Sequence, residues 1–311
     1  MRRFKGEACL MITAIVWGSA FVFQKMGMDH IGPFTFGAFR FIIGALALLP
    51  VMLIASKVNP HVPANHRMHI TKWKDKTLLA GAVLCGVTCF GAGSLLQVGL
   101  VYTTAGKAGF ITCMDVVFVP IILLFLKRKV HPLTWTGIAI AVCGLYLLCI
   151  TDGFNIKFGD GLVMLSAVVC SFQILFIDYY AEKLDVLKLA FSQFMVAGIL
   201  SIPPALIFEV INFQDIIACT GPILYVALLE VSLAFTLQIV GQKYTPPAIA
   251  TIIVALESVF SALFAAWILG EVMTVREVIG SGLMFIAFII AQIPDMEILK
   301  ERTALKNPDE L

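Results

Sequence analysis

The feature that most constrains this chain is a series of apolar segments, each long enough to cross a lipid bilayer as a helix. Crossing the hydrocarbon takes about 20 mostly apolar residues. Hydrophobic residues make up 60% of the 311 residues and charged residues 14%, whereas a soluble domain is about half apolar and about a quarter charged. We therefore predict an all-α integral membrane protein with ten transmembrane helices. The ten segments are 7–27, 33–55, 77–99, 104–126, 132–151, 159–180, 186–208, 219–241, 247–269 and 275–294.

Lysine and arginine residues are unevenly divided between the two sides of this predicted arrangement. With ten spans, 17 of the 22 basic residues lie on the same side as the N-terminus, and the opposite loops contain only Lys25, Lys157 and Arg276. Cytoplasmic loops carry the excess of basic residues in membrane proteins. We therefore predict a multi-pass protein of the plasma membrane with both termini in the cytoplasm, residues 295–311 forming a cytoplasmic tail.

The two halves of the sequence are weakly similar to each other. One alignment of the halves places Glu7 against Asp160, and a second alignment, with a shorter offset, places Gln97 against Gln238. The matches are few, and apolar sequences also align by chance. They nevertheless suggest an internal duplication.

A duplication has a direct consequence for topology. The two halves, 7–151 and 159–294, contain five predicted spans each. Since five is an odd number, the second half has to insert upside down relative to the first. Inverted repeats are typical of secondary transporters, in which they surround a substrate site near the middle of the membrane. We expect two inverted five-helix repeats around a central cavity.

Four short sequence patterns follow one another along the chain. Together they resemble the EamA branch of the drug/metabolite transporter superfamily. The resemblance implies two five-helix EamA domains around a central cavity and the transport of amino acids, other metabolites or drugs. Asp115 and Ser258 depart from residues that the family often has, so the substrates of relatives are not carried over. The patterns are WGSAF at 17–21, FRF at 39–41, TTAGKAGFIT at 103–112 leading to VFVP at 117–120, and ESVF at 257–260 followed by LGE at 269–271.

Charged residues inside the predicted spans are the strongest candidates for function. They are Arg40, Lys107, Asp115, Glu230 and Glu257. A charge at the bilayer centre costs about 2.5–3.5 kcal/mol on insertion scales, and such residues are usually functional or paired. The three acids are candidates for binding substrate or exchanging a proton, and the alternative is that they join helices by hydrogen bonds. We expect Arg40 to form a structural ion pair, and Lys107 to attract an anionic group or to reach the outer headgroups.

Uncharged polar residues at helical spacing extend this set of candidates. Trp17 and Gln24 share one face of the first span, Gln173 lies on the corresponding span of the second half, and Gln238 follows Glu230 on the eighth. The alternative for such faces is close packing between helices. The predicted substrate-binding or coupling residues are Trp17, Gln24, Gln97, Lys107, Asp115, Gln173, Glu230, Gln238 and Glu257.

The sequence favours transport over other classes of function. It contains no clustered metal ligands, phosphate-binding loop or nucleophile motif, and no basic patch typical of nucleic-acid binding. We expect no enzymatic activity, no metal and no cofactor. The predicted function is transport, with export favoured, of an amino acid, an amine or a drug-like compound by alternating access, with protons as possible coupling ions. The alternatives are an uncoupled carrier and a non-transporting membrane enzyme or sensor.

Overall fold

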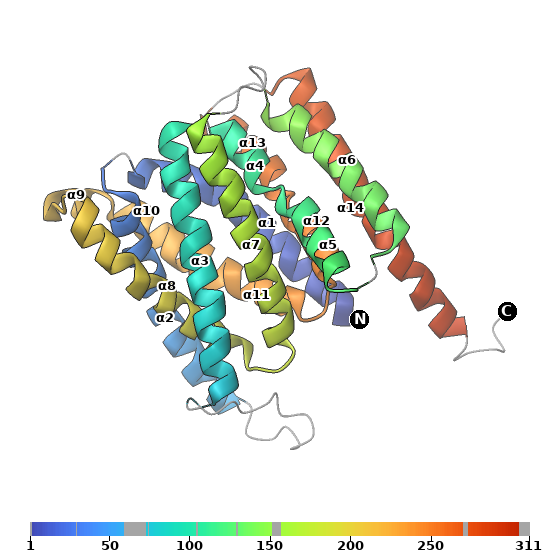
Figure 1. Ribbon diagram of the computed structural model, residues 1–311, viewed down its shortest axis with the longest axis horizontal. Helices are drawn as coiled ribbons and strands as arrows, with labels where there is room; N and C mark the ends of the chain where they lie inside the picture. The colour runs from blue at the N-terminus through green and yellow to red at the C-terminus, as the bar shows by residue number, and fades with distance from the viewer. Residues whose placement is uncertain are drawn as a thin grey trace.

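The chain folds as an assembly of long helices (Figure 1). The computed structural model describes residues 2–28, 30–58, 73, 75–103, 105–128, 130–150, 157–269 and 273–304, and the regular structure in these ranges is all helical. Within them, eight helical segments are long and apolar enough to cross a membrane. The elements that form them are α2 (Pro33–Val58), α3 (Lys76–Tyr102), α4 (Ala105–Thr112) with α5 (Asp115–Phe125), α6 (Pro132–Cys149), α7 (Phe158–Ala181), α8 (Val186–Phe208), α10 (Thr220–Tyr225) with η1 (Val226–Phe235) and α11 (Thr236–Gln242), and α12 (Pro247–Val254) with α13 (Glu257–Leu269).

Three further helices complete the assembly. They are α1 (Arg2–Met28), α9 (Phe213–Ala218) and α14 (Val275–Ala304). The sequence did not predict α9, and it ended the last span at residue 294, well before α14 ends. Prolines mark the starts of several helices, because proline fixes φ and needs no hydrogen-bond acceptor in the first turn. Pro132 and Pro247 begin α6 and α12 in this way.

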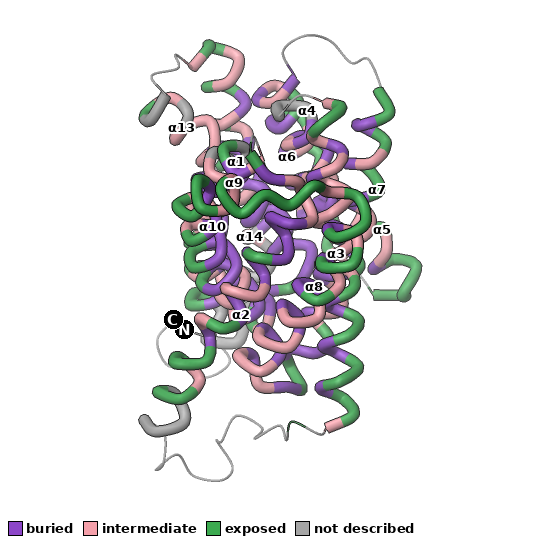
Figure 2. Tube along the Cα trace, turned by 90° about the vertical axis from the view of Figure 1, so that its left-hand side faces the viewer, coloured by how far each residue is buried: buried purple, intermediate pink, exposed green. Residues whose placement is uncertain are grey.

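The distribution of polarity is that of a protein surrounded by lipid. Many large apolar side chains are exposed on the outside, among them Phe125, Phe208 and Trp267. The buried residues lie toward the middle of the assembly (Figure 2), and they include polar side chains such as Gln97 and Gln193. An apolar exterior of this extent is unfavourable in water. The fold therefore suits the hydrocarbon of a membrane.

The helices of the two halves of the chain pack mainly against each other. α3 packs along α7 and α8, α2 along α8 and η1, and α1 along α13, α11 and η1. α6 and α14 lie side by side at one edge of the molecule (Figure 1). Glycines allow this close packing: a Cβ atom on Gly280 would lie 2.7 Å from the carbonyl oxygen of Gly144, and one on Gly159 would lie 2.7 Å from that of Gly99. Small residues bring helix backbones together in membranes in this way.

Two hydrogen bonds between helices each join a hydroxyl in one half of the chain to a backbone carbonyl in the other half. The Thr13 hydroxyl on α1 donates to the carbonyl oxygen of Ala234 at 2.9 Å. The Ser166 hydroxyl on α7 donates to the carbonyl oxygen of Ala92 on α3 at 2.7 Å. Both hydroxyls are buried, so each bond joins two helices in the interior of the protein.

Two segments predicted as single helices, 104–126 and 247–269, are interrupted instead. A turn separates α4, which ends at Thr112, from α5, which begins at Asp115. Another separates α12, which ends at Val254, from α13, which begins at Glu257. Bonds from residue i to i+3 replace part of the α-helical pattern at both turns. The second helix of each pair begins with an acid. A negative charge there is stabilised by the positive, N-terminal end of the helix dipole.

The start of α2 is tied to the end of α8 by Glu209. The two oxygens of its carboxylate accept hydrogen bonds from the backbone N–H groups of Phe34 and Thr35, both at 2.7 Å. The first N–H groups of a helix have no partner within the helix. We expect Glu209→Ala to lower the free energy of unfolding by about 1–2 kcal/mol, the range for loss of a helix cap, as measured by SDS-induced unfolding in mixed micelles.

The exposed Glu182 provides the control for this prediction. It lies at the C-terminal cap of α7, where a negative charge is unfavourable to the helix dipole. Glu182→Ala should therefore leave the free energy of unfolding unchanged or raise it. Equal losses in the two variants would contradict the role assigned to Glu209.

Candidate functional site

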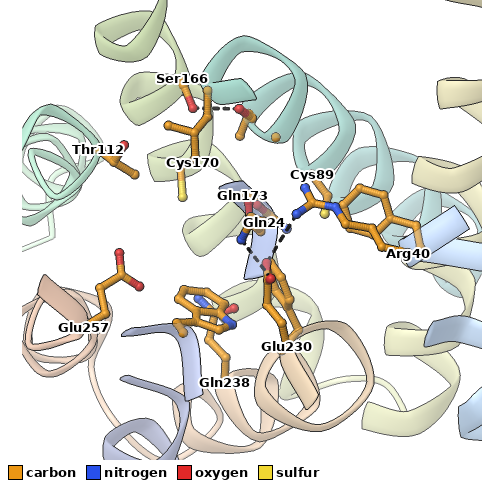
Figure 3. Close-up of a pocket in the computed structure, with 16 residues that line it drawn as sticks. Gln24, Arg40, Cys89, Thr112, Ser166, Cys170, Gln173, Glu230, Gln238 and Glu257 are labelled. Carbon is orange, nitrogen blue, oxygen red and sulfur yellow. Dashed lines mark hydrogen bonds and ion pairs between the residues drawn. The ribbon is translucent and has the colours of Figure 1, made fainter. Parts of the chain in front are cut away.

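A cavity lies in the interior of the helix assembly (Figure 3). It encloses about 720 Å³ of empty space, part of it open to solvent. Side chains from both halves of the chain line it, on α1, α2, α3, α4, α7, η1, α11 and α13. The lining residues are Trp17, Gln24, Arg40, Phe41, Cys89, Ala92, Gly93, Leu96, Thr112, Ser166, Cys170, Gln173, Glu230, Phe235, Gln238 and Glu257.

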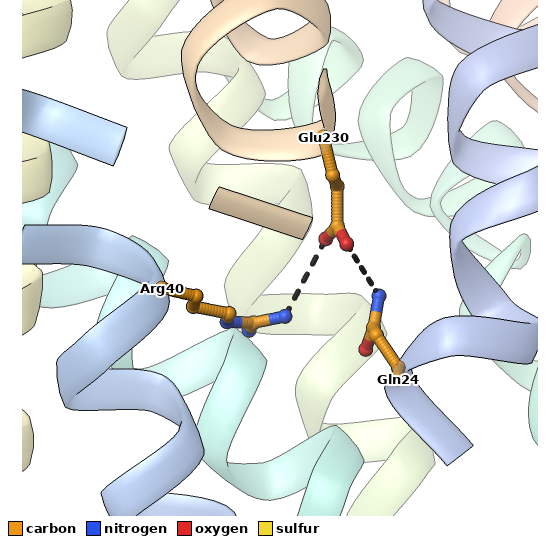
Figure 4. A network of polar contacts seen from close by, with 3 residues as sticks. All are labelled: Gln24, Arg40 and Glu230. Carbon is orange, nitrogen blue, oxygen red and sulfur yellow. Dashed lines mark hydrogen bonds and ion pairs between the residues drawn. The ribbon is translucent and has the colours of Figure 1, made fainter. Parts of the chain in front are cut away.

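An ion pair occupies one side of the cavity (Figure 4). Nη1 of Arg40 lies 3.4 Å from Oε1 of Glu230, and Nε2 of Gln24 donates to Oε2 of Glu230 at 2.8 Å. The guanidinium also lies over the ring of Phe41, with Cζ 4.6 Å from the ring centroid. Both charged side chains are buried. The two charges therefore neutralise each other within the protein, as a buried ion pair requires.

Glu230 lies on a wider helix than the sequence predicted. Residues Val226–Phe235 form a π-helix rather than a continuation of the α-helix. π-helical turns are rare and occur frequently at functional sites. Ala227, Glu230 and Ala234 on this π-helix and Gln238 on α11 are all buried.

Glu257 occupies the other side of the cavity. In Figure 3 its carboxylate points into the cavity, on the side opposite Glu230 and Arg40. It has one weak contact, with Sγ of Cys113 at 3.8 Å from Oε1, and within the described part of the chain no basic side chain forms an ion pair with it. A buried carboxylate without a cation is available for a ligand cation or a proton.

Aromatic side chains provide the apolar part of the lining. The rings of Trp17 and Phe235 lie 4.6 Å apart between centroids, at an angle of 59°, and both residues line the cavity. Nε1 of Trp17 and Oε1 of Gln238 are buried without a hydrogen-bond partner. The cavity thus combines apolar faces with a few polar atoms, as small-molecule sites do.

Six of the nine predicted binding or coupling residues line this cavity, together with Arg40. Two others, Gln97 and Asp115, are buried but are not among the lining residues. The side chain of Lys107 lies outside the part of the chain that the structure describes. That any of them binds substrate or a coupling ion stays a prediction. The six are Trp17, Gln24, Gln173, Glu230, Gln238 and Glu257.

Two further lining residues, Ser166 and Cys170, share a helical face with Gln173, and the sequence already indicated that this face lines a cavity. Apolar lining residues such as Phe41 and Leu96 gave no signal, since a residue facing a cavity and one facing lipid look alike in an apolar sequence.

The sequence model of the EamA-like transporter family matches residues 4–150 and 157–292, which is nearly the whole chain. The chain belongs to this family. The match confirms the resemblance inferred from the four short patterns. It also identifies the chain as a multi-pass membrane protein of a transporter family.

Individual relatives are similar over almost their full lengths. An uncharacterized transporter of Archaeoglobus fulgidus is 32% identical over 302 residues, which cover 94% of this EamA-like chain and 87% of the relative. The uncharacterized transporter YetK of Bacillus subtilis is 27% identical over 293 residues, covering 89% and 85%. A protein of known crystal structure superposes with a TM-score of 0.76 at 15% identity, covering 95% of this chain and 99% of that one. At this identity the last comparison shows the fold alone.

Proposed function

We propose that this EamA-like protein exports a small metabolite, such as an amino acid, an amine or a drug-like compound, across the plasma membrane by alternating access. The observation that carries the proposal is the central cavity. Side chains from both halves of the chain line it, and it contains buried carboxyl groups within a protein whose outer surface is apolar. A cavity between two halves that rock against each other is the arrangement by which repeat-built transporters work.

We further propose ten spans, with α1 and α14 as the first and the tenth, arranged as two inverted repeats. Thr13 and Ser166, the donors of the two similar hydrogen bonds, have the same separation in sequence as the aligned acids Glu7 and Asp160. This regularity supports a duplication in the first part of each half.

A second regularity relates the later parts of the two halves. The acceptors of the same two bonds, Ala92 and Ala234, have the same separation in sequence as Asp115 and Glu257, the residues that follow the two helix interruptions. Asp115 therefore corresponds to Glu257 in position, and the two interruptions are equivalent features of the repeat.

The hydrogen bonds to Ala92 and Ala234 favour a slightly longer offset between the later parts of the two halves than the sequence alignment suggested. Gln97 and Gln238 are then not equivalent positions, and Leu96 corresponds to Gln238. Leu96 and Gln238 both line the cavity, whereas Gln97 does not. The offset taken from the contacts therefore relates the cavity-lining positions of the two halves.

The interrupted helices suit a transporter that changes conformation. Each interruption places an acid at the beginning of a second half-helix, in the interior of the protein. Discontinuous helices at the midplane are where repeat-built transporters bind substrates and coupling ions. Proton coupling through Glu257 or Asp115 is therefore part of the proposal, and an uncoupled carrier is the alternative. Glu230 is the weaker candidate, because Arg40 and Gln24 already hold it.

The positions of the basic residues support the predicted orientation, and the lining of the cavity disfavours a non-transporting enzyme. Basic residues concentrate on the side of the termini, as cytoplasmic segments do. The described lining residues include no nucleophile hydrogen-bonded to a base, which catalysis by acyl transfer would require. With both termini in the cytoplasm, export would load the cavity from the side of the termini.

Flux through purified protein tests the proposal. The full chain is reconstituted into proteoliposomes, and the uptake of labelled amino acids and amines is measured with and without an imposed proton gradient. Accumulation above equilibrium only with the gradient would support coupled transport, and equilibration regardless of the gradient would support the uncoupled carrier. No flux of any compound would contradict the proposal.

Two glycines on α3 test whether the substrate passes through the cavity, one as the test position and the other as its matched control. Gly93 lines the cavity, and a Cβ atom there would lie 3.1 Å from Nη2 of Arg40. Gly91 is outside the lining, and a Cβ atom there would make only an ordinary contact with Val169 at 3.5 Å. Gly93→Leu should reduce the flux because it fills the cavity, whereas Gly91→Leu should leave the flux close to that of the unmodified protein.

A further inference from the structure

We infer that the cavity selects organic cations: the ammonium group of the substrate binds Glu257, and an apolar or aromatic body packs against Trp17 and Phe235. This inference rests on the proposed function and names the substrate class. It goes beyond the broad set of amino acids, amines and drug-like compounds, because it separates cations from zwitterions, anions and neutral compounds.

The net charge of the described lining residues is the first argument for a cationic substrate. The charged members are Arg40, Glu230 and Glu257, which in their ionised forms sum to one negative charge. Arg40 and Glu230 neutralise each other at 3.4 Å, so the uncompensated charge lies on Glu257. A ligand with one positive charge would neutralise it, whereas an anion would add a second negative charge in a cavity of low dielectric constant.

The state of Arg40 disfavours a substrate carboxylate. Nη1 of Arg40 already contacts Glu230, and the guanidinium lies over the rings of Phe41 and Phe36, with Cζ 4.6 Å and 5.9 Å from their centroids. Nε of Arg40 has no hydrogen-bond partner, but it is buried. A substrate carboxylate at Arg40 would have to share this guanidinium with Glu230, which already neutralises its charge. A zwitterionic amino acid therefore gains less from this cavity than the corresponding amine.

The remaining polar and aromatic groups fit an ammonium with an apolar body. An ammonium group carries only hydrogen-bond donors, and the cavity offers it the oxygens of Glu257. Oε1 of Gln238, buried without a partner, is a further acceptor in the lining. The rings of Trp17 and Phe235, which contact each other at a tilt of 59° and line the cavity, suit an apolar or aromatic body, and aromatic faces also attract cations.

Direct binding to the purified full-length protein tests this inference separately from transport. Isothermal titration at pH 7 compares 2-phenylethylamine, tyramine and tryptamine with phenylalanine, 3-phenylpropionate and 2-phenylethanol, which share a similar aromatic body but differ in charge. We expect at least one amine to bind at least tenfold more tightly than the zwitterion, the anion and the neutral alcohol. Equal affinities across the charge classes, or no binding of any amine, would overturn the inference.

Substitution of the carboxylate identifies the binding group. We expect Glu257→Gln to weaken binding of the amine at least tenfold and to remove most of the preference over 2-phenylethanol, while Glu257→Asp retains part of both. Glu182→Gln, which changes an exposed carboxylate, should leave the affinity unchanged. Thermal unfolding and size-exclusion profiles verify that the variants are folded. Unchanged amine affinity in a folded Glu257→Gln variant would overturn the inference.

The two kinds of failure are distinguishable. If proteoliposomes transport zwitterions or anions as well as amines, and Glu257→Gln does not alter the preference, the charge selection is wrong and the proposed transport stands. If amines bind through Glu257 but no compound crosses the membrane, the binding site stands and the proposed transport is wrong.

Discussion

Arg40→Met is expected to lower the free energy of unfolding by about 3–5 kcal/mol, the range for removing one partner of a buried ion pair. The substitution keeps much of the side-chain volume but leaves Glu230, which is 6% exposed, without its cation. Gln24 would then be the one described side chain still hydrogen-bonded to this carboxylate. SDS-induced unfolding in mixed micelles measures the loss, with the unmodified protein as reference.

A second substitution separates loss of charge balance from loss of packing. Glu230→Gln removes the negative charge and keeps an oxygen that can accept from Gln24. The double variant Arg40→Met/Glu230→Gln should therefore recover most of the stability that Arg40→Met loses, because replacement of both charges leaves no buried charge unpaired. The double-mutant cycle gives the coupling energy. Additive losses in the two single variants would contradict a direct interaction between Arg40 and Glu230.

Gly280→Leu is expected to lower the free energy of unfolding by about 3 kcal/mol or more, because overpacking at this helix contact displaces backbone rather than side chains. A Cβ atom at Gly280 would lie 2.7 Å from the carbonyl oxygen of Gly144 and 2.8 Å from the backbone nitrogen of Leu148. Neither atom can move without shifting α6 as a whole. The same unfolding measurement tests the prediction.

Gly282 on the same helix is the matched control. A Cβ atom there meets no atom within 4 Å, and the residue is exposed on the outer face. Gly282→Leu adds the same apolar side chain and the same gain in helix propensity, but it points away from α6. It should leave stability unchanged or raise it slightly. Similar losses at both positions would show that the close contact between α6 and α14 does not limit stability.

The sequence by itself determined that this is a helical membrane protein, because that property is local. Each apolar run of about 20 residues satisfies its backbone hydrogen bonds within itself and buries its side chains in lipid, whatever its neighbours do. The prolines that begin α6 and α12 act within a single turn. Polar residues inside such runs are conspicuous for the same reason, and this is why Gln24, Glu230 and Glu257 were identified as candidates before their surroundings were known.

Which polar residues pair with one another could be determined only from the tertiary structure. Arg40 and Glu230 are 190 residues apart in sequence, and Gln24 and Glu230 are 206 residues apart. No local pattern reports which of three intramembrane acids meets the arginine. Helix packing brought Arg40 to Glu230 and left Glu257 facing the cavity, so the structure assigned different surroundings to two acids that the sequence ranked as near equals.

The interruptions in the helices were also decided at the tertiary level. The segments 104–126 and 247–269 are apolar enough to read as continuous helices, and the turns before Asp115 and Glu257 contain no proline or glycine at the point of interruption. The sequence determined which side chains are too polar for lipid, because transfer from water to hydrocarbon depends on the residue alone. The tertiary structure decided which of them share a cavity, because that depends on how helices from both halves of the chain pack together.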